Sequence, residues 1–213
     1  MALFVKRPVI GDTANLYTTG EEKVLLIIGL GNIGKEYTGT RHNIGFEVVE
    51  YFAQKQDFPG WTVNKDRKCA ETSKTLGSAR VILCKPTTFM NLSGEALQAI
   101  QQFYKIANSS TLAVYDEADI DFGQIRTRKG GGAAGHNGVK SLIQHNGEDF
   151  GRVRIGVGPK KPAQIDLADF VLSKFSKKEQ DDLDLLLQES NSLLSEYSHS
   201  GGQLLDETRS FII

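Results

Sequence analysis

Cysteine is scarce in this sequence, since Cys69 and Cys84 are the only two among 213 residues. Two thiols are too few for the disulfide framework of a small secreted domain or for a cysteine-rich zinc site. Both lie in segments with a strand-like pattern, so we expect buried thiols. The cysteine count therefore favours a cytoplasmic protein held together by an ordinary apolar core.

Long apolar runs are also absent, because none approaches the ~20 residues that a helix needs to cross a bilayer. The first 21 residues contain acids and lack the apolar centre of a signal peptide. We interpret residues 1–21 as an N-terminal extension of a cytoplasmic protein with no membrane partner. The sequence does not reveal what this extension does.

A strong excess of one charge is missing too, because the formal net charge is only −1. This average hides a gradient. Residues 126–161 carry eight Lys or Arg against two acids, whereas residues 164–190 carry three Lys against seven acids. A charged block is commonly just a solvated surface. Here the basic block adjoins the polar motifs described below, which favours a phosphate-bearing substrate.

Short apolar segments alternate with segments of helical periodicity along most of the chain. This alternation predicts an α/β fold, with a twisted, mostly parallel (mixed) sheet and helices on both faces. The apolar strands are predicted at 24–28, 81–84, 112–115 and 153–157, more polar strands near 68–75 and 124–128, and helices at 44–56, 92–104, 139–144 and 176–197.

The sequence contains no internal repeat and no linker between two domains. We therefore predict a single domain over residues 22–198, followed by a C-terminal tail at 199–213 that either docks or stays loose. The polar stretch 158–163, GPKKPA, is predicted to be a mobile loop.

The segment 24–45 contains the most informative pattern. An apolar run ends in Gly29, Gly31 and Gly34, which is the letter pattern of a dinucleotide-binding turn. A turn of that kind should run straight into a helix whose N-terminus meets a pyrophosphate. Polar residues, including His42, stand there instead. The glycines therefore favour a backbone that presents Asn32 and His42.

Four polar segments contain the candidate chemistry, and most of them directly follow predicted apolar strands. In open α/β sheets ligands bind beyond the carboxyl ends of the strands, so we expect the four to meet. They are Asn32 with Tyr37 and 40–43, residues 86–94, residues 116–119 and the glycine-rich stretch 130–138.

Together these segments offer a histidine, a carboxylate and several amides. Neutral histidine is a good general base near pH 7, and Asp116 could bond one ring nitrogen and stabilise the imidazolium. Asparagine amides can bind an ester carbonyl without charge. This set fits the attack of a base-activated water on an acyl carbon.

Each of these residues also has a structural interpretation. His42 could be a structural or surface histidine, residues 116–119 a turn, and residues 130–138 a hairpin or a helix start capped by Asn137. A metal site is not favoured, because His136 and His145 are nine residues apart and the acids lack ligand spacing. Ser93 lacks the flanking pattern of a serine hydrolase elbow.

Taken together, the motifs closely resemble those of the bacterial-type peptidyl-tRNA hydrolase family. They occur in the family's order and span about residues 25–172. The matching pieces are 29–34 with Tyr37, 40–45, 85–94, 116–117, 130–132 with 135–138, and 152–158.

The resemblance implies an esterase that releases peptide from peptidyl-tRNA as a monomer, with no metal or cofactor. By position, His42 would activate water, Asp116 would hold His42 in its basic form, and Asn32 would distinguish blocked from free amino groups. Asn91 and Asn137 would bind the substrate near its ester. Tyr37 and Phe89 would line the cleft at the tRNA 3′ end, and Arg126, Arg128, Lys140, Arg154 and Lys160 would contact the tRNA backbone.

The sequence departs from the family pattern in three places. Ile33 replaces a usual proline, which leaves the turn less rigid. Ala118 replaces a common leucine, and Ala133-Ala134 replaces a more glycine-rich pair. Two other functions stay open: a noncatalytic RNA-binding module of the same fold, and an oxidoreductase that uses the glycine turn. The latter would need an acid about 20 residues on, after a second strand, and Glu47 and Glu50 fall within a predicted helix.

Overall fold

Four parallel strands form the centre of the sheet, in the order β4 (Ala79–Pro86), β1 (Lys23–Gly29), β5 (Thr111–Asp121) and β7 (Gly151–Gly158). The computed structural model describes residues 23–160 and 164–211. The expected extension at residues 1–21 therefore lies outside the described residues, as does part of the expected loop at 158–163.

Antiparallel strands extend both edges of this parallel core. β3 (Cys69–Leu76) and β2 (Thr62–Asn64) follow β4, while β6 (Gln124–Lys129) and β8 (Thr208–Ser210) follow β7. The sheet is therefore mixed, with the order β2-β3-β4-β1-β5-β7-β6-β8, which confirms the predicted fold class.

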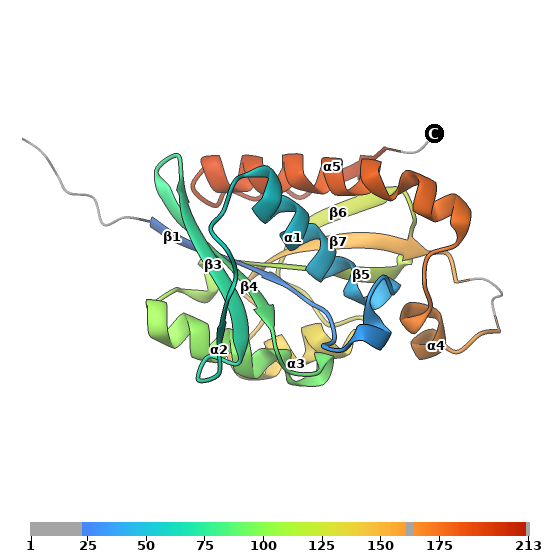
Figure 1. The fold of residues 1–213 in the computed structure, drawn as a ribbon, viewed down its shortest axis with the longest axis horizontal. Coiled ribbons are helices and arrows are strands. Elements are labelled where there is room, and N and C mark those ends of the chain that lie inside the picture. The colour runs from blue at the N-terminus through green and yellow to red at the C-terminus, as the bar shows by residue number, and fades with distance from the viewer. Residues whose placement is uncertain (1–22, 161–163, 212–213) are drawn as a thin grey trace, which may run out of the picture.

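Helices cover both faces of the sheet (Figure 1). Two of them, α1 (Ile44–Lys55) and α5 (Lys177–His199), pack on one face, and two more, α2 (Ser93–Tyr104) and α3 (Asn137–Asn146), pack on the other. The short α4 (Leu167–Leu172) contacts β5 and the turn before α1. None of the helices in the described part of the chain is long and apolar enough to cross a membrane.

The central strands are apolar throughout because both of their faces are covered. Along β1, Leu25 and Ile27 join the core under α1 and α5, whereas Leu26 and Ile28 join the core under α2 and α3. All four side chains are fully buried, and each stabilises the fold by roughly 1.5–3 kcal/mol relative to an exposed position. Cys69 and Cys84 are also buried and unpaired, as expected.

Several boundaries differ from the sequence prediction. Asp116 does not follow a strand that ends at Tyr115, because β5 continues to Asp121 through its pairing with β7. The sequence also missed β2, α4 and β8, which are three to six residues long and too short for a clear periodicity. The C-terminal tail docks, since β8 pairs with β6 and Phe211 packs against the core.

Candidate active site

The turn after β1 is shaped by close packing of backbone. A Cβ atom on Gly29 would clash with the carbonyl of Gly45, and one on Gly45 would clash with the backbone of Val114 and Leu30. The chain then forms two short 3₁₀ turns, η1 (Lys35–Tyr37) and η2 (Arg41–Asn43), before α1 begins. The glycines thus let η2 approach β5, and the first α-helix after this turn begins only at Ile44, beyond both 3₁₀ turns.

This approach brings His42 to Asp116. Nδ1 of His42 lies 2.8 Å from Oδ1 of Asp116, although the two residues are 74 positions apart in the sequence. The His42 side chain is 11% exposed, and the Asp116 side chain is 2% exposed. A histidine that reaches the cleft is therefore fixed by a carboxylate behind it.

His136 contacts the same carboxylate oxygen, with Nε2 3.0 Å from Oδ1 of Asp116. Its Nδ1 accepts the backbone N–H groups of Gly138 (3.1 Å) and Val139 (3.2 Å), so His136 caps the N-terminus of α3. Asn137, which the sequence suggested as the cap, is instead the first helical residue. The sequence signal for His136 was a histidine three residues before the start of the predicted helix at 139–144, near enough for a ring nitrogen to accept backbone N–H groups.

The hydrogen bonds of His136 define its tautomer. Because Nδ1 accepts two N–H groups, it carries no proton, and Nε2 must be the nitrogen that donates to Asp116. Asp116 in turn accepts from Nδ1 of His42, which leaves Nε2 of His42 as the unprotonated nitrogen that can act as a base. Two histidines thus have different fixed roles around one carboxylate.

The ionised form of Asp116 is strongly favoured. Burial by itself would raise the pKa of this carboxyl, but the interactions with His136 and then with His42 more than offset it. The pKa of Asp116 therefore lies well below its usual range. The carboxylate stays charged at neutral pH, where it can stabilise a proton acquired by His42.

Asn32 is held in a defined orientation beside this pair. Its backbone exchanges two hydrogen bonds with the side chain of Asn43, at 2.8 and 2.9 Å. Its Oδ1 accepts the N–H of Met90 at 2.8 Å, which identifies Nδ2 as the remaining donor. Within the described part of the chain Nδ2 has no partner, so it can donate to a ligand in the cleft.

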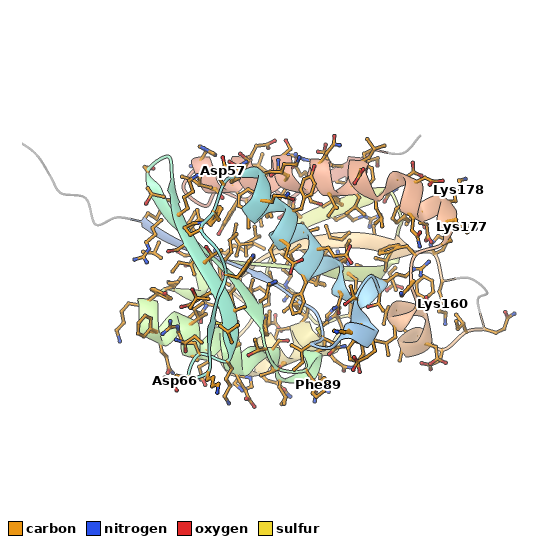
Figure 2. The ribbon with its side chains drawn as sticks, in the orientation of Figure 1. Asp57, Asp66, Phe89, Lys160, Lys177 and Lys178 are labelled. Carbon is orange, nitrogen blue, oxygen red and sulfur yellow. The ribbon has the colours of Figure 1, made fainter. Side chains whose placement is uncertain are left out.

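These residues line a cleft of about 740 Å³. Its walls have different characters: one is the polar stretch from Ala134 to Asn137, and another is α4, from which Leu167 and Leu172 are 43% and 40% exposed. Phe89 is 51% exposed on the rim and lies at the lower edge of the molecule in Figure 2. The predicted residues that line the cleft together are Asn32, His42, Phe89, Asn91, Asp116 and Asn137.

The remaining predicted residues lie outside this cleft. Tyr37 is in η1 and is not among the lining residues. Arg128 is exposed on β6, with its guanidinium next to Gly131. Arg154 is not a free cation, because its Nε and Nη2 donate to Oε2 of Glu117 at 3.2 and 3.1 Å, and Glu117 lines the cleft.

Arg152 shapes the glycine-rich stretch that leads to His136. Its buried guanidinium donates to the carbonyl of Gly132 at 2.6 Å and also to that of Gly131. The same guanidinium lies 4.6 Å from the ring centroid of Phe150. Arg152 thus fixes the loop that carries His136 and Asn137. The sequence alone did not indicate this role.

Three potential metal ligands do come together, since ring nitrogens of His42 and His136 and a carboxylate oxygen of Asp116 lie within 4.8 Å of one another. A bound cation would need Nε2 of His136 without its proton. That proton cannot move to Nδ1 without breaking the two bonds that cap α3. The hydrogen bonding therefore fits an imidazole–carboxylate–imidazole chain better than a metal site.

Comparison with known proteins identifies relatives across most of the chain. The family model described as "Peptidyl-tRNA hydrolase" matches residues 26–209. The peptidyl-tRNA hydrolase of Shouchella clausii is 46% identical over 157 residues, covering 72% of this chain and 82% of the relative. The chloroplastic enzyme of Arabidopsis thaliana is 46% identical over 165 residues, covering 76% and 56%. The crystal structure of peptidyl-tRNA hydrolase from Acinetobacter baumannii superimposes with a TM-score of 0.77 at 34% identity, covering 84% and 90%.

Proposed function

This chain belongs to the peptidyl-tRNA hydrolase family, and we propose that it cleaves the ester between peptide and tRNA with a water molecule activated by His42. The observation that carries this mechanism is the 2.8 Å contact between Nδ1 of His42 and the buried Asp116. It directs the basic Nε2 of His42 toward the cleft. Family membership supports the reaction, and the geometry supports the choice of base.

In the first step, Nε2 of His42 takes a proton from water as the water oxygen attacks the ester carbonyl carbon. The carbonyl oxygen becomes an oxyanion, and Asp116 stabilises the imidazolium through Nδ1–H. In the second step the intermediate collapses, the bond to the tRNA ribose oxygen breaks, and His42 returns the proton to that oxygen. The products are a free peptide carboxyl and a tRNA with its hydroxyl restored.

The three carboxamides have complementary roles in this proposal. Nδ2 of Asn32 is an oriented donor, suited to the carbonyl of a blocked amino group, which a free aminoacyl group lacks. Asn91 and Asn137 are exposed on the cleft wall and can donate to the ester carbonyl or hold the attacking water. Neutral amides suit this task because they stabilise developing charge without ionising.

The polar and basic side of the molecule is suited to the tRNA. Arg126, Arg128 and Lys140 are exposed on β6 and α3, and phosphate contacts of this kind position a nucleic acid without reading its sequence. Phe89, on the rim, offers an aromatic face on which a terminal base can stack. Arg154 would contact the tRNA backbone only to the extent that its pairing with Glu117 allows. Tyr37 would contact the tRNA outside the cleft.

A monomeric state and a cytoplasmic location complete the proposal. The resemblance to the family implies the first, and the low cysteine count and the lack of a signal peptide favour the second. One of the relatives is named as chloroplastic, so members of the family differ in location. Sedimentation of the purified protein would test the first, and imaging of a tagged chain would test the second.

The direct test uses two substrates that differ only at the amino group, N-acetylaminoacyl-tRNA and free aminoacyl-tRNA. We expect the protein to hydrolyse the first and to spare the second. Tight RNA binding with no cleavage of either substrate would instead identify a binding module.

A further inference from the structure

Arg41 immediately precedes His42, yet its side chain contacts a different part of the molecule. The residue is 6% exposed, and its guanidinium faces the chain that follows α4. Nη1 donates to Oγ of Ser173 at 2.9 Å and to the carbonyl of Lys174, and Nη2 pairs with Oε2 of Glu179 at 2.7 Å. One buried cation thus joins η2, the end of α4 and the start of α5.

Two aromatic rings complete this environment. The Arg41 guanidinium carbon lies 4.7 Å from the ring centroid of Phe170 and 5.1 Å from that of Phe175. Cation–π contacts are stronger when they are desolvated, as here. Since Phe170 belongs to α4, the contact fixes the inner face of this helix against Arg41.

The main chain makes the same connection. Arg41 N–H donates to the carbonyl of Ser173 at 3.1 Å, and Thr40 forms an isolated antiparallel bridge with Lys174. The turn that carries His42 and the C-terminal end of α4 are therefore one packed unit.

The opposite face of α4 lines the cleft. Leu167, Val171 and Leu172 form an apolar wall there, while Arg126, Arg128 and Lys140, the exposed cations proposed to contact the tRNA, lie on β6 and α3. If the tRNA follows the basic side, the peptide lies along the apolar wall. The distance between that wall and His42 then decides how well a peptide side chain packs while its ester reaches the base.

We propose that Arg41 is a positioning residue that holds α4 as the peptide-binding wall at a fixed distance from His42. The inference rests on the proposed function, because it assigns a role within the same cleft. It concerns the binding of the peptide portion of the substrate, and Arg41 itself touches no reacting atom.

Arg67 provides a matched control elsewhere in the fold. It also stacks on two aromatic rings, with its guanidinium carbon 4.0 Å from Phe103 and 5.6 Å from Tyr104, and it pairs with Glu71. It does not line the cleft. Arg67→Met therefore removes a cation that has similar partners, two aromatic rings and a carboxylate. The substitution does not disturb α4.

The experiment compares wild type, Arg41→Met, Arg41→Lys, Glu179→Gln and Arg67→Met on two substrates. One is N-acetylglycyl-tRNA, which has no side chain to pack against the α4 wall. The other is an N-acetylated tripeptidyl-tRNA with leucine side chains. We expect Arg41→Met to raise KM for the leucine substrate by about fivefold or more while KM for the glycine substrate and both kcat values change less than about threefold. Arg41→Lys should recover part of this loss, because it keeps a cation near Glu179.

Hydrogen exchange of the α4 amides is a second measurement that does not depend on turnover. Faster exchange in Arg41→Met, with unchanged exchange in Arg67→Met, would support the proposal. Equal KM changes on both substrates, or α4 exchange matching that of wild type, would overturn it. If Arg41→Met does not fold, Glu179→Gln and Arg41→Lys provide the same comparison. Absence of cleavage by wild type would instead contradict the proposed function, while the exchange measurement would still test the role of Arg41.

Discussion

The imidazoles of His42 and His136 lie with ring centroids 4.9 Å apart, bridged by one carboxylate oxygen of Asp116. The arrangement is asymmetric. Nδ1 of His136 accepts the N–H groups that start α3, whereas Nε2 of His42 faces the cleft. One ring is therefore fixed as a donor and the other can accept a proton. This asymmetry leads to separate predictions for the three residues.

Asp116→Asn should lower kcat by on the order of 10²- to 10⁴-fold, because the amide neither stabilises an imidazolium nor selects the tautomer of His42. The rate–pH profile should also change, because the amide cannot stabilise a proton on His42 through Nδ1–H. In wild type the pKa of Asp116 is held well below its usual range, so no limb near neutral pH should come from this residue. A variant with the rate and profile of wild type would remove Asp116 from the mechanism.

His136→Asn separates the two roles of His136. Asparagine is a good N-cap and its Oδ1 can replace Nδ1, but its shorter side chain has no nitrogen at the position from which Nε2 of His136 donates to Asp116. We expect kcat to fall by about tenfold, with the free energy of unfolding changed by less than about 1 kcal/mol. His136→Ala should lose a further ~1 kcal/mol of stability, because it also removes the cap. Denaturant unfolding and single-turnover kinetics on both variants check this, and equal rates in His136→Asn and wild type would argue against it.

Glu47 should make stability depend on pH away from the active site. Burial, and then the nearby Glu50, raise the pKa of Glu47 to about 7. A carboxyl whose pKa is higher in the folded state than in the unfolded state binds extra protons when folded, so stability falls as pH rises from about 4.5 through about 7. Glu47→Gln should therefore raise the free energy of unfolding by about 1–3 kcal/mol at pH 8 and by almost nothing at pH 4. Urea unfolding at the two pH values measures this, and an equal gain at both would contradict it.

Arg128→Gln tests the tRNA side. The side chain is exposed on β6, so its loss should raise KM about threefold to tenfold with little change in kcat. The slope of log KM against log salt should fall in magnitude by about one, as expected when one phosphate contact is lost. Lys74→Gln is a suitable control, because Lys74 lies on β3 and donates to the carbonyls of Gln56 and Asp57. If the slope of log KM against log salt were the same in Arg128→Gln and wild type, Arg128 would not contact a tRNA phosphate.

The sequence predicted the elements with strong periodicity and missed those without it. Residues 24–28 were recognisable as a strand because both faces of β1 are buried, and α5 because its apolar positions recur on one side. The three residues of β8 contain no such signal, since their pairing with β6 depends on where the tail docks. The extension of β5 past Tyr115 likewise depends on its partner β7, which lies far along the chain.

The site was predictable in composition and less so in connectivity. His42, Asp116 and the asparagines were selected as candidates because their residue types are complementary and because their motifs resemble a known family, and the structure places them along one cleft. The hydrogen bond from His136 to Asp116 was not predicted, because it depends on how Arg152 holds the glycine-rich loop. Arg152 reaches Gly132 and Gly131, which lie 20 and 21 positions earlier in the sequence. Arg41 was overlooked for the same reason, since its partners Ser173 and Glu179 lie more than a hundred residues away.

The most direct test of the account is single-turnover cleavage of N-acetylaminoacyl-tRNA by His42→Ala, measured alongside its affinity for the same tRNA. We expect the rate of ester cleavage to fall by at least about 10³-fold, because the base is gone, while the Kd for tRNA stays within about threefold of wild type. Cleavage near the wild-type rate, with binding intact, would show that another group activates the water.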